Sequence, residues 1–147
     1  FQFEQLTFNA SYHMDCEAAV QSFLDNTFMK GNVPQTVLTY AQLFWAIGKE
    51  QNISPFHLAS RVYQEQGQGT SPLISGTYPG YEGYYNYFNM GSAGTGYFEI
   101  FRGGMTEAIE GTPVMASQWG GNPSWNTRWK ALYGGSLKVK EKYISIY

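Results

Sequence analysis

The clearest hydrophobic pattern in the chain lies between Ser54 and Gly67. Ser54 followed by Pro55 is a typical helix start, because serine accepts a free backbone N–H and proline at the first helical position loses no hydrogen bond. A glycine then ends the segment, as glycine does just past many helices. The residues that recur at helical spacing on one face are Pro55, Leu58, Ala59, Val62 and Gln66. The pattern therefore predicts a helix over residues 55–66 with one buried face.

Two more amphipathic helices are predicted before this one. Residues 15–30 carry apolar and small side chains at positions typical of a single buried helix face, namely Val20, Phe23, Leu24, Thr27 and Phe28. Thr39 with Gln42 three residues later is a capping box, in which each side chain accepts a hydrogen bond from the other's backbone N–H. We expect the second helix to run from this box to about residue 51.

From Gly76 onward the helical pattern weakens. Residues 78–101 are rich in aromatic side chains and glycine, and a long loop of this kind in a compact domain is usually functional. We expect it to form one wall of a cleft, either as a loop or with a short hairpin around the alternating residues 97–101. Further on, the pattern predicts a helical turn at 103–110, a helix from Ser124 to Gly134–Gly135, and a last helix from Ser136.

Helices before and after a strand-poor loop predict a mostly α (α+β) fold. They fit the lysozyme-like plan, in which a carboxylate at the end of a core helix borders a cleft. The length of 147 residues suits a single domain with a sizeable core. We expect residues 1–147 to form that domain, with residues 1–14 as an extended N-terminal arm.

Glu65 is the residue on the predicted helix that suggests chemistry. It lies in the last turn, at the edge of the apolar stripe and beside a glycine-rich exit. Partial burial and the negative end of the helix dipole would both favour its protonated form, which a general acid needs. The alternative is a surface carboxylate paired with Arg61 one turn earlier. The periodicity alone leaves both roles open.

A resemblance to a known family favours the first role. The run Ser-Pro-Phe-His-Leu-Ala-Ser-Arg-Val-Tyr-Gln-Glu-Gln-Gly at 54–67, with Gly-Thr-Ser at 69–71, resembles the catalytic-helix signature of glycoside hydrolase family 73. Tyr-Asn-Tyr-Phe-Asn-Met at 85–90 is similar to the second block of that family. Trp-Asn-Thr at 125–127, Lys-Ala-Leu at 130–132 and Gly-Gly-Ser at 134–136 resemble its C-terminal block. Three blocks in the right order are far more specific than one.

The resemblance implies a peptidoglycan endo-β-N-acetylglucosaminidase, the catalytic domain of an autolysin, with a lysozyme-like fold. It implies that Glu65 is the catalytic acid. The substrate-binding residues that we predict along the cleft are Tyr85, Asn86, Tyr87, Trp119 and Trp125. As the second carboxylate we predict Glu99, in the expected hairpin strand, with assistance by the 2-acetamido group of the substrate as the alternative. One departure is Asn89, where relatives commonly carry glycine.

Composition limits the partners. The net charge of −2 and the pI of about 5.6 offer no basic surface for nucleic acid. Aromatic residues reach 18% while charged ones make up 14%, a balance suited to stacking on sugar rings. With Cys16 as the only cysteine and two histidines in the chain, we expect no intrachain disulfide, no metal site and no cofactor. No window predicts a membrane span.

We thus expect a monomeric hydrolase of the GlcNAc-β-1,4-MurNAc bond that binds peptidoglycan glycan strands and is secreted to the bacterial cell wall. The start at Phe1 suggests an excised domain or a processed product. A lytic transglycosylase is one alternative, although that group usually has serine after the catalytic glutamate, where this chain has Gln66. A glycan-binding module without catalytic activity is the other.

Overall fold

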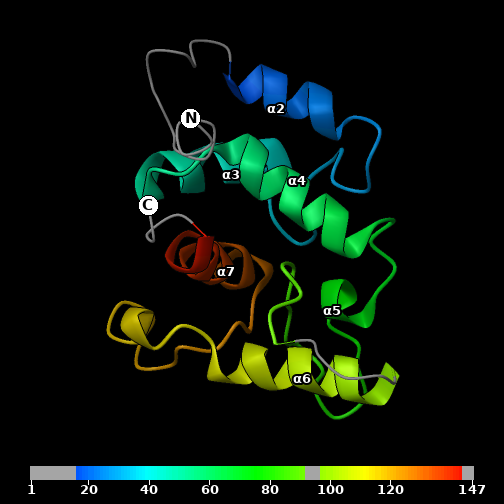
Figure 1. Cartoon of the computed structure of the whole chain (residues 1–147), viewed down its shortest axis with the longest axis vertical. Coiled ribbons are helices and arrows are strands. Elements are labelled where there is room, and N and C mark those ends of the chain that lie inside the picture. The colour runs from blue at the N-terminus through cyan, green and yellow to red at the C-terminus, as the bar shows by residue number, and fades with distance from the viewer. Residues whose placement is uncertain (1–15, 92–96, 144–147) are drawn as a thin grey trace. The chain divides into compact units, whose positions relative to one another are not determined.

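The computed structural model describes residues 16–91 and 97–143 (Figure 1). Within these ranges the regular elements are helices, joined by turns and by an isolated antiparallel bridge between Asn32 and Thr39. The predicted mostly helical class is confirmed to that extent. The predicted N-terminal arm at 1–14 lies outside the described residues.

The chain divides into two compact units. Unit 1 comprises residues up to Gln68 together with Val139 onward, and unit 2 comprises Gly69–Lys138. Unit 1 contains α2 (Cys16–Leu24), α3 (Tyr40–Gln51), α4 (Pro55–Gln66) and the C-terminal end of α7 (Arg128–Tyr143). Unit 2 contains α5 (Pro72–Ser75), α6 (Tyr97–Glu110), the short 3-10 helix η2 (Pro113–Met115) and the first part of α7.

In unit 1 the helices α2, α3 and α4 pack on one another (Figure 1). The predicted capping box of α3 is confirmed, since the backbone N–H of Gln42 donates to Thr39 at 3.0 Å and that of Thr39 donates to Gln42 at 2.9 Å. The helix ends at Gln51 as predicted, because Asn52 adopts a left-handed conformation with φ of 57°. The core of this unit includes Phe44, Ile47, Leu58 and Val62.

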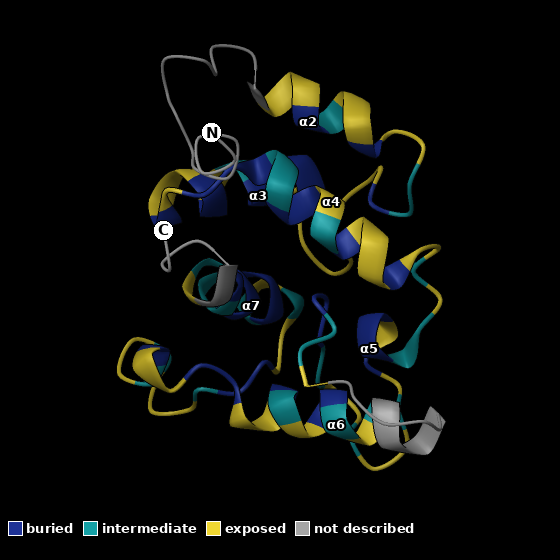
Figure 2. Cartoon of the chain, viewed as in Figure 1, coloured by how far each residue is buried: buried dark blue, intermediate teal, exposed yellow. Residues whose placement is uncertain are grey.

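Helix α4 begins and ends where the sequence predicts. The Ser54 side chain accepts a hydrogen bond from the backbone of His57, and Gly67 follows the last helical residue. Its buried positions are the five expected ones, and Figure 2 shows that buried and exposed positions alternate along this helix. Gly48 allows the turn before α4 to pass close to α3, because a Cβ there would lie 2.5 Å from the carbonyl oxygen of Ile53.

Helix α2 is shorter than predicted. It ends at Leu24 rather than at residue 30. A turn begins at Leu24, whose carbonyl accepts hydrogen bonds from both the backbone N–H and the side-chain hydroxyl of Thr27. Val20 and Leu24 are buried as expected, whereas Phe23 is exposed. The side-chain hydroxyl of Thr27 thus stabilises a turn where the periodicity alone would have continued the helix.

In unit 2 the expected hairpin at 97–101 is wrong, because these residues begin α6. The alternation Tyr-Phe-Glu-Ile-Phe fits a strand over five residues, but the chain continues with Met105 and Ala108 at helical spacing. Both are fully buried, and the Ala108 carbonyl accepts a hydrogen bond from the backbone of Trp125 at 2.8 Å. A longer window therefore reverses the period that the shorter one suggests.

Helix α7 runs without a break through Gly134–Gly135, so the two separate helices expected there are wrong. It begins at Arg128 after Thr127, whose side chain accepts from the backbone of Lys130 at 3.1 Å, and not at Ser124. Both glycines are buried against neighbouring segments. Their cost in helix stability is offset by that close packing, so they do not end the helix here.

Candidate functional site

Glu65 lies in the last turn of α4, in unit 1. Its side chain is exposed, so the predicted partial burial at the edge of the apolar stripe is wrong. The carboxylate is therefore open to solvent.

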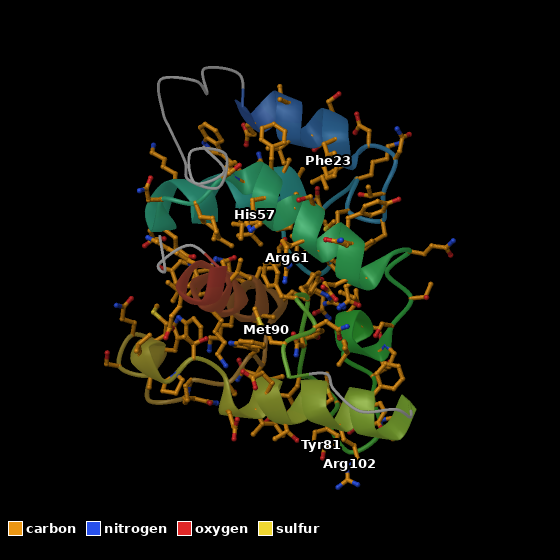
Figure 3. The ribbon with its side chains drawn as sticks, viewed as in Figure 1. Phe23, His57, Arg61, Tyr81, Met90 and Arg102 are labelled. Atoms are coloured by element: carbon orange, nitrogen blue, oxygen red, sulfur yellow. The ribbon has the colours of Figure 1, made fainter. Side chains whose placement is uncertain are left out.

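His57 and Arg61 lie one turn apart on α4 (Figure 3). His57 is partly buried, and its Nε2 is a buried atom without a hydrogen-bond partner among the described residues. Burial lowers the pKa of His57, and the positive charge of Arg61 lowers the pKa further. The imidazole is thus favoured in its neutral form.

The loop around Asn86 is fastened inside unit 2. The Asn86 side chain donates to the carbonyls of Met90 at 2.7 Å and Gly104 at 3.0 Å, and accepts from the Met90 backbone at 3.1 Å. The residue is fully buried. Its amide therefore connects the loop to α6. Contact between this side chain and a sugar is not compatible with the burial.

Tyr87 and Trp125 are also fully buried in unit 2. The indole N–H of Trp125 donates to the Thr112 hydroxyl at 3.0 Å, and Gly134 lies so close that a Cβ there would be 2.5 Å from the same nitrogen. Phe88, expected in the core, is buried as well. Direct substrate contact by Tyr87 and Trp125 therefore does not fit this arrangement; they pack beneath the surface.

Tyr85 is the member of this block that reaches the surface of unit 2 in part. Its ring lies against Gly76, where a Cβ would come within 2.5 Å, and the guanidinium of Arg128 lies over the ring at 4.6 Å from the centroid. Gly76 adopts a positive φ of 71°, so glycine is favoured there by both space and conformation. Tyr85 thus presents its remaining edge together with a positive charge.

Trp119 belongs to an aromatic cluster that periodicity did not predict, in which Trp119 is partly exposed and Tyr133 is buried. Its ring packs edge-on against the rings of Trp129 and Tyr133, with centroid distances of 6.0 Å and 6.4 Å. The ring of Trp129 stacks on that of Tyr133, with a centroid distance of 5.0 Å and an interplanar angle of 20°. Trp129 is 38% exposed. The spacing of four residues between Trp129 and Tyr133 was the available signal, since such residues are neighbours on a helix.

The acids downstream of Glu65 differ in how they are held. Glu99 lies in α6 and not in a strand, and its side chain lies outside what the structure describes. Glu82 accepts a hydrogen bond from the backbone of Gly80 at 3.1 Å within a local turn. Glu107 and Lys138 form a partly buried ion pair. The predicted site residues thus divide between the units: Glu65 belongs to unit 1, and the others belong to unit 2.

Within the described ranges, no cluster of three or more His, Cys, Asp or Glu side chains offers a metal-binding group. None of the helices there is long and apolar enough to cross a membrane. Comparisons with models of protein families, with curated protein sequences and with solved structures gave no significant match. The likeness to glycoside hydrolase family 73 therefore rests on the three sequence blocks.

Proposed function

We propose that the protein hydrolyses the GlcNAc-β-1,4-MurNAc bond of bacterial peptidoglycan, with Glu65 as the general acid and then the general base. The observation that carries this proposal is the placement of Glu65. It is an exposed carboxylate in the last turn of α4, a helix whose ends and buried face coincide with the catalytic-helix signature.

The Glu65 carboxyl group meets water in the free protein. A glycan strand lying over α4 would exclude that water from the site. We propose that the protonated acid forms with substrate bound, donates its proton to the glycosidic oxygen, and then activates water as a carboxylate.

The second catalytic group is either Glu99 or the substrate itself. Placement of Glu99 in a helix removes the hairpin argument that favoured it. Glu82 and Glu107 already have partners, in a turn and in an ion pair. Assistance by the 2-acetamido group of the substrate needs no further carboxylate and becomes the stronger account. Activity of a Glu99→Gln variant at or near the wild-type rate would support it, and a loss comparable to that of Glu65→Gln would contradict it.

Tyr85 and Trp119 remain as proposed sugar contacts, because both retain exposed surface. Asn86, Tyr87 and Trp125 are proposed to support them from below, since they are fully buried. We further propose a lysozyme-like arrangement of the helices and secretion to the cell wall, where the substrate occurs.

A lytic transglycosylase and a non-catalytic glycan-binding module are the competing functions. The first makes a 1,6-anhydro sugar by internal attack, and the second makes no product. Gln66, which follows Glu65, is a buried member of the α4 stripe and takes the position where transglycosylases usually carry serine. This residue favours hydrolysis over the anhydro reaction.

The test is mass spectrometry of the fragments released from purified peptidoglycan. We expect fragments that end in a reducing GlcNAc, and a loss of roughly 10²- to 10⁴-fold in rate for Glu65→Gln. Glu50→Gln is the matched control, since Glu50 is an exposed carboxylate of α3 in the same unit, and its rate should equal that of the wild type. Anhydro ends, or a Glu65→Gln variant with more than half of the activity, would contradict the proposal.

A further inference from the structure

Trp129 is an unusual residue to leave in contact with solvent. All four tryptophans of the chain lie in the described ranges, and Trp129 is the one in the exposed class, at 38%. A tryptophan side chain gains much free energy from burial, so an exposed one on a helix is costly without a partner. Exposed, rigid aromatic residues are typical of binding surfaces.

The orientation of the Trp129 ring is fixed by its neighbours. One face stacks on Tyr133, which is 8% exposed, and Trp119 contacts the ring edge-on. Trp119 is held in turn by backbone hydrogen bonds to Met115 at 3.0 Å and Ala116 at 3.2 Å. Gly134 gives it room, since a Cβ there would lie 3.2 Å from its ring. The outer face of Trp129 is thus preorganised, which lowers the entropy cost of binding.

The surroundings of this ring are basic. Residues 119–133 contain Arg128 and Lys130 and no acidic residue, in a chain whose net charge is −2. The ammonium of Lys130 lies 5.5 Å from the centre of the Trp119 ring, and Lys130 is partly exposed. A flat aromatic face beside a cation matches a sugar ring that carries a carboxylate. Two copies of this positive surface would repel each other, which disfavours self-association through it.

We propose that Trp119, Trp129, Tyr133 and Lys130 form a glycan-binding platform. An amino sugar of a peptidoglycan strand stacks on the outer face of Trp129, and a carboxylate of the lactyl or stem-peptide substituent pairs with Lys130. The platform retains the enzyme on insoluble wall material and does not take part in bond cleavage. In the choice of glycan this inference rests on the proposed function, but the binding that it describes needs no catalysis.

The test measures co-sedimentation with insoluble glycans, using protein that carries Glu65→Gln so that the substrate stays intact. Peptidoglycan sacculi provide the acidic glycan, and chitin provides a neutral β-1,4-linked GlcNAc polymer. Trp129→Ala should weaken binding to both by roughly two- to tenfold, the range that one aromatic contact gives. Lys130→Gln should weaken binding to sacculi alone and reduce its dependence on salt.

Two variants guard against a trivial loss of binding. Phe23→Ala removes an aromatic side chain of similar exposure, 40%, from unit 1 and should bind as the parent does. Trp129→Phe keeps an aromatic face and should recover part of the affinity. The melting temperature of each variant is measured as well, so that a loss of folding is not mistaken for a loss of binding.

The inference is overturned if Trp129→Ala binds both glycans within twofold of the parent, or if Phe23→Ala loses as much. It is also overturned if Trp129→Ala instead dissociates a dimer in analytical ultracentrifugation, because the platform would then be an interface between copies. Its failure is separable from that of the proposed function. If the wild type releases reducing ends and Trp129→Ala binds normally, the hydrolase proposal stands and the platform is overturned. If Trp129→Ala binds weakly and the wild type releases no reducing ends, the platform stands and the hydrolase proposal is overturned.

Discussion

Unit 1 and unit 2 are built in different ways. In unit 1 the helices α3 and α4 follow from capping residues and apolar stripes that can be read locally. In unit 2 the same local reasoning fails at α6 and α7, where contacts between distant residues decide the structure. Asn86, for example, joins a loop to Gly104, 18 residues away. From this comparison we expect single substitutions to cost more in unit 2, where a few tight contacts join distant segments, than at the helix caps of unit 1.

The largest effect that we expect is on unit 2, at Gly111. This residue has a φ of 62°, and a Cβ there would lie 1.8 Å from the backbone oxygen of Pro123. Gly111→Ala should therefore lower the free energy of unfolding by about 3–5 kcal/mol, measured by denaturant titration. Gly120 is the matched control, because its φ is 70° and a Cβ built there would have no neighbouring atom within 4 Å. Gly120→Ala should cost only about 1–2 kcal/mol, and equal losses would mean that the contact with Pro123 contributes nothing.

The next effect concerns Asn86. Asn86→Ala removes the three side-chain hydrogen bonds that join Asn86 to Met90 and Gly104. We expect a loss of about 2–3 kcal/mol in the free energy of unfolding. The exposed Asn126 is the control, and its replacement by alanine should change stability by less than about 0.5 kcal/mol. A comparably small change for Asn86→Ala would show that the loop is held by packing alone.

A smaller effect is expected in unit 1, at the cap of α3. Thr39→Ala removes one half of the capping box and should cost about 1 kcal/mol in thermal or denaturant unfolding. Ser60→Ala provides the comparison, since the Ser60 hydroxyl donates to a carbonyl of its own helix and caps no free N–H. If Thr39→Ala were as harmful as Gly111→Ala, the proposed contrast between the two units would be wrong.

The smallest effect is a dependence of stability on pH through His57. Burial, and then Arg61, lower its pKa below the ordinary value of 6.5, so around pH 6 the unfolded chain binds a proton that the folded chain does not. Stability contributed by the neutral imidazole is therefore complete above pH 6.5 and falls as the pH decreases. Because His57 is partly exposed, we expect a shallow slope, well below one full proton.

The slope is obtained by measuring the free energy of unfolding at several pH values between 5.5 and 7.5, a range that brackets the ordinary histidine pKa of 6.5. His57→Gln should flatten it. His13→Gln removes the other histidine of the chain and is the control, because it should leave the slope that is due to His57 in place. Stability that increases on acidification in the wild type, and not in His57→Gln, would reverse the assigned direction of the pKa.

The candidate site shows the same contrast. The place of Glu65 at the end of α4 follows from the spacing of apolar residues, because helix position is a local property. Its exposure does not, since the amount of protein around a stripe edge depends on what packs there. Among the aromatic residues the pattern could not separate Trp125, fully buried, from Trp129, which is exposed. Both are tryptophans near the start of one predicted helix.

The sequence by itself determined the mostly helical class, the capped start of α3, the bounds of α4, and the position of Glu65. Each of these depends on residues within one or two helical turns, where capping and periodicity act directly. Only the tertiary structure decided that α7 continues through Gly134–Gly135, that Asn86 holds a loop, and that Trp129 faces solvent. These features depend on which distant segments approach one another, because a glycine or an aromatic ring has no fixed role until its neighbours are known.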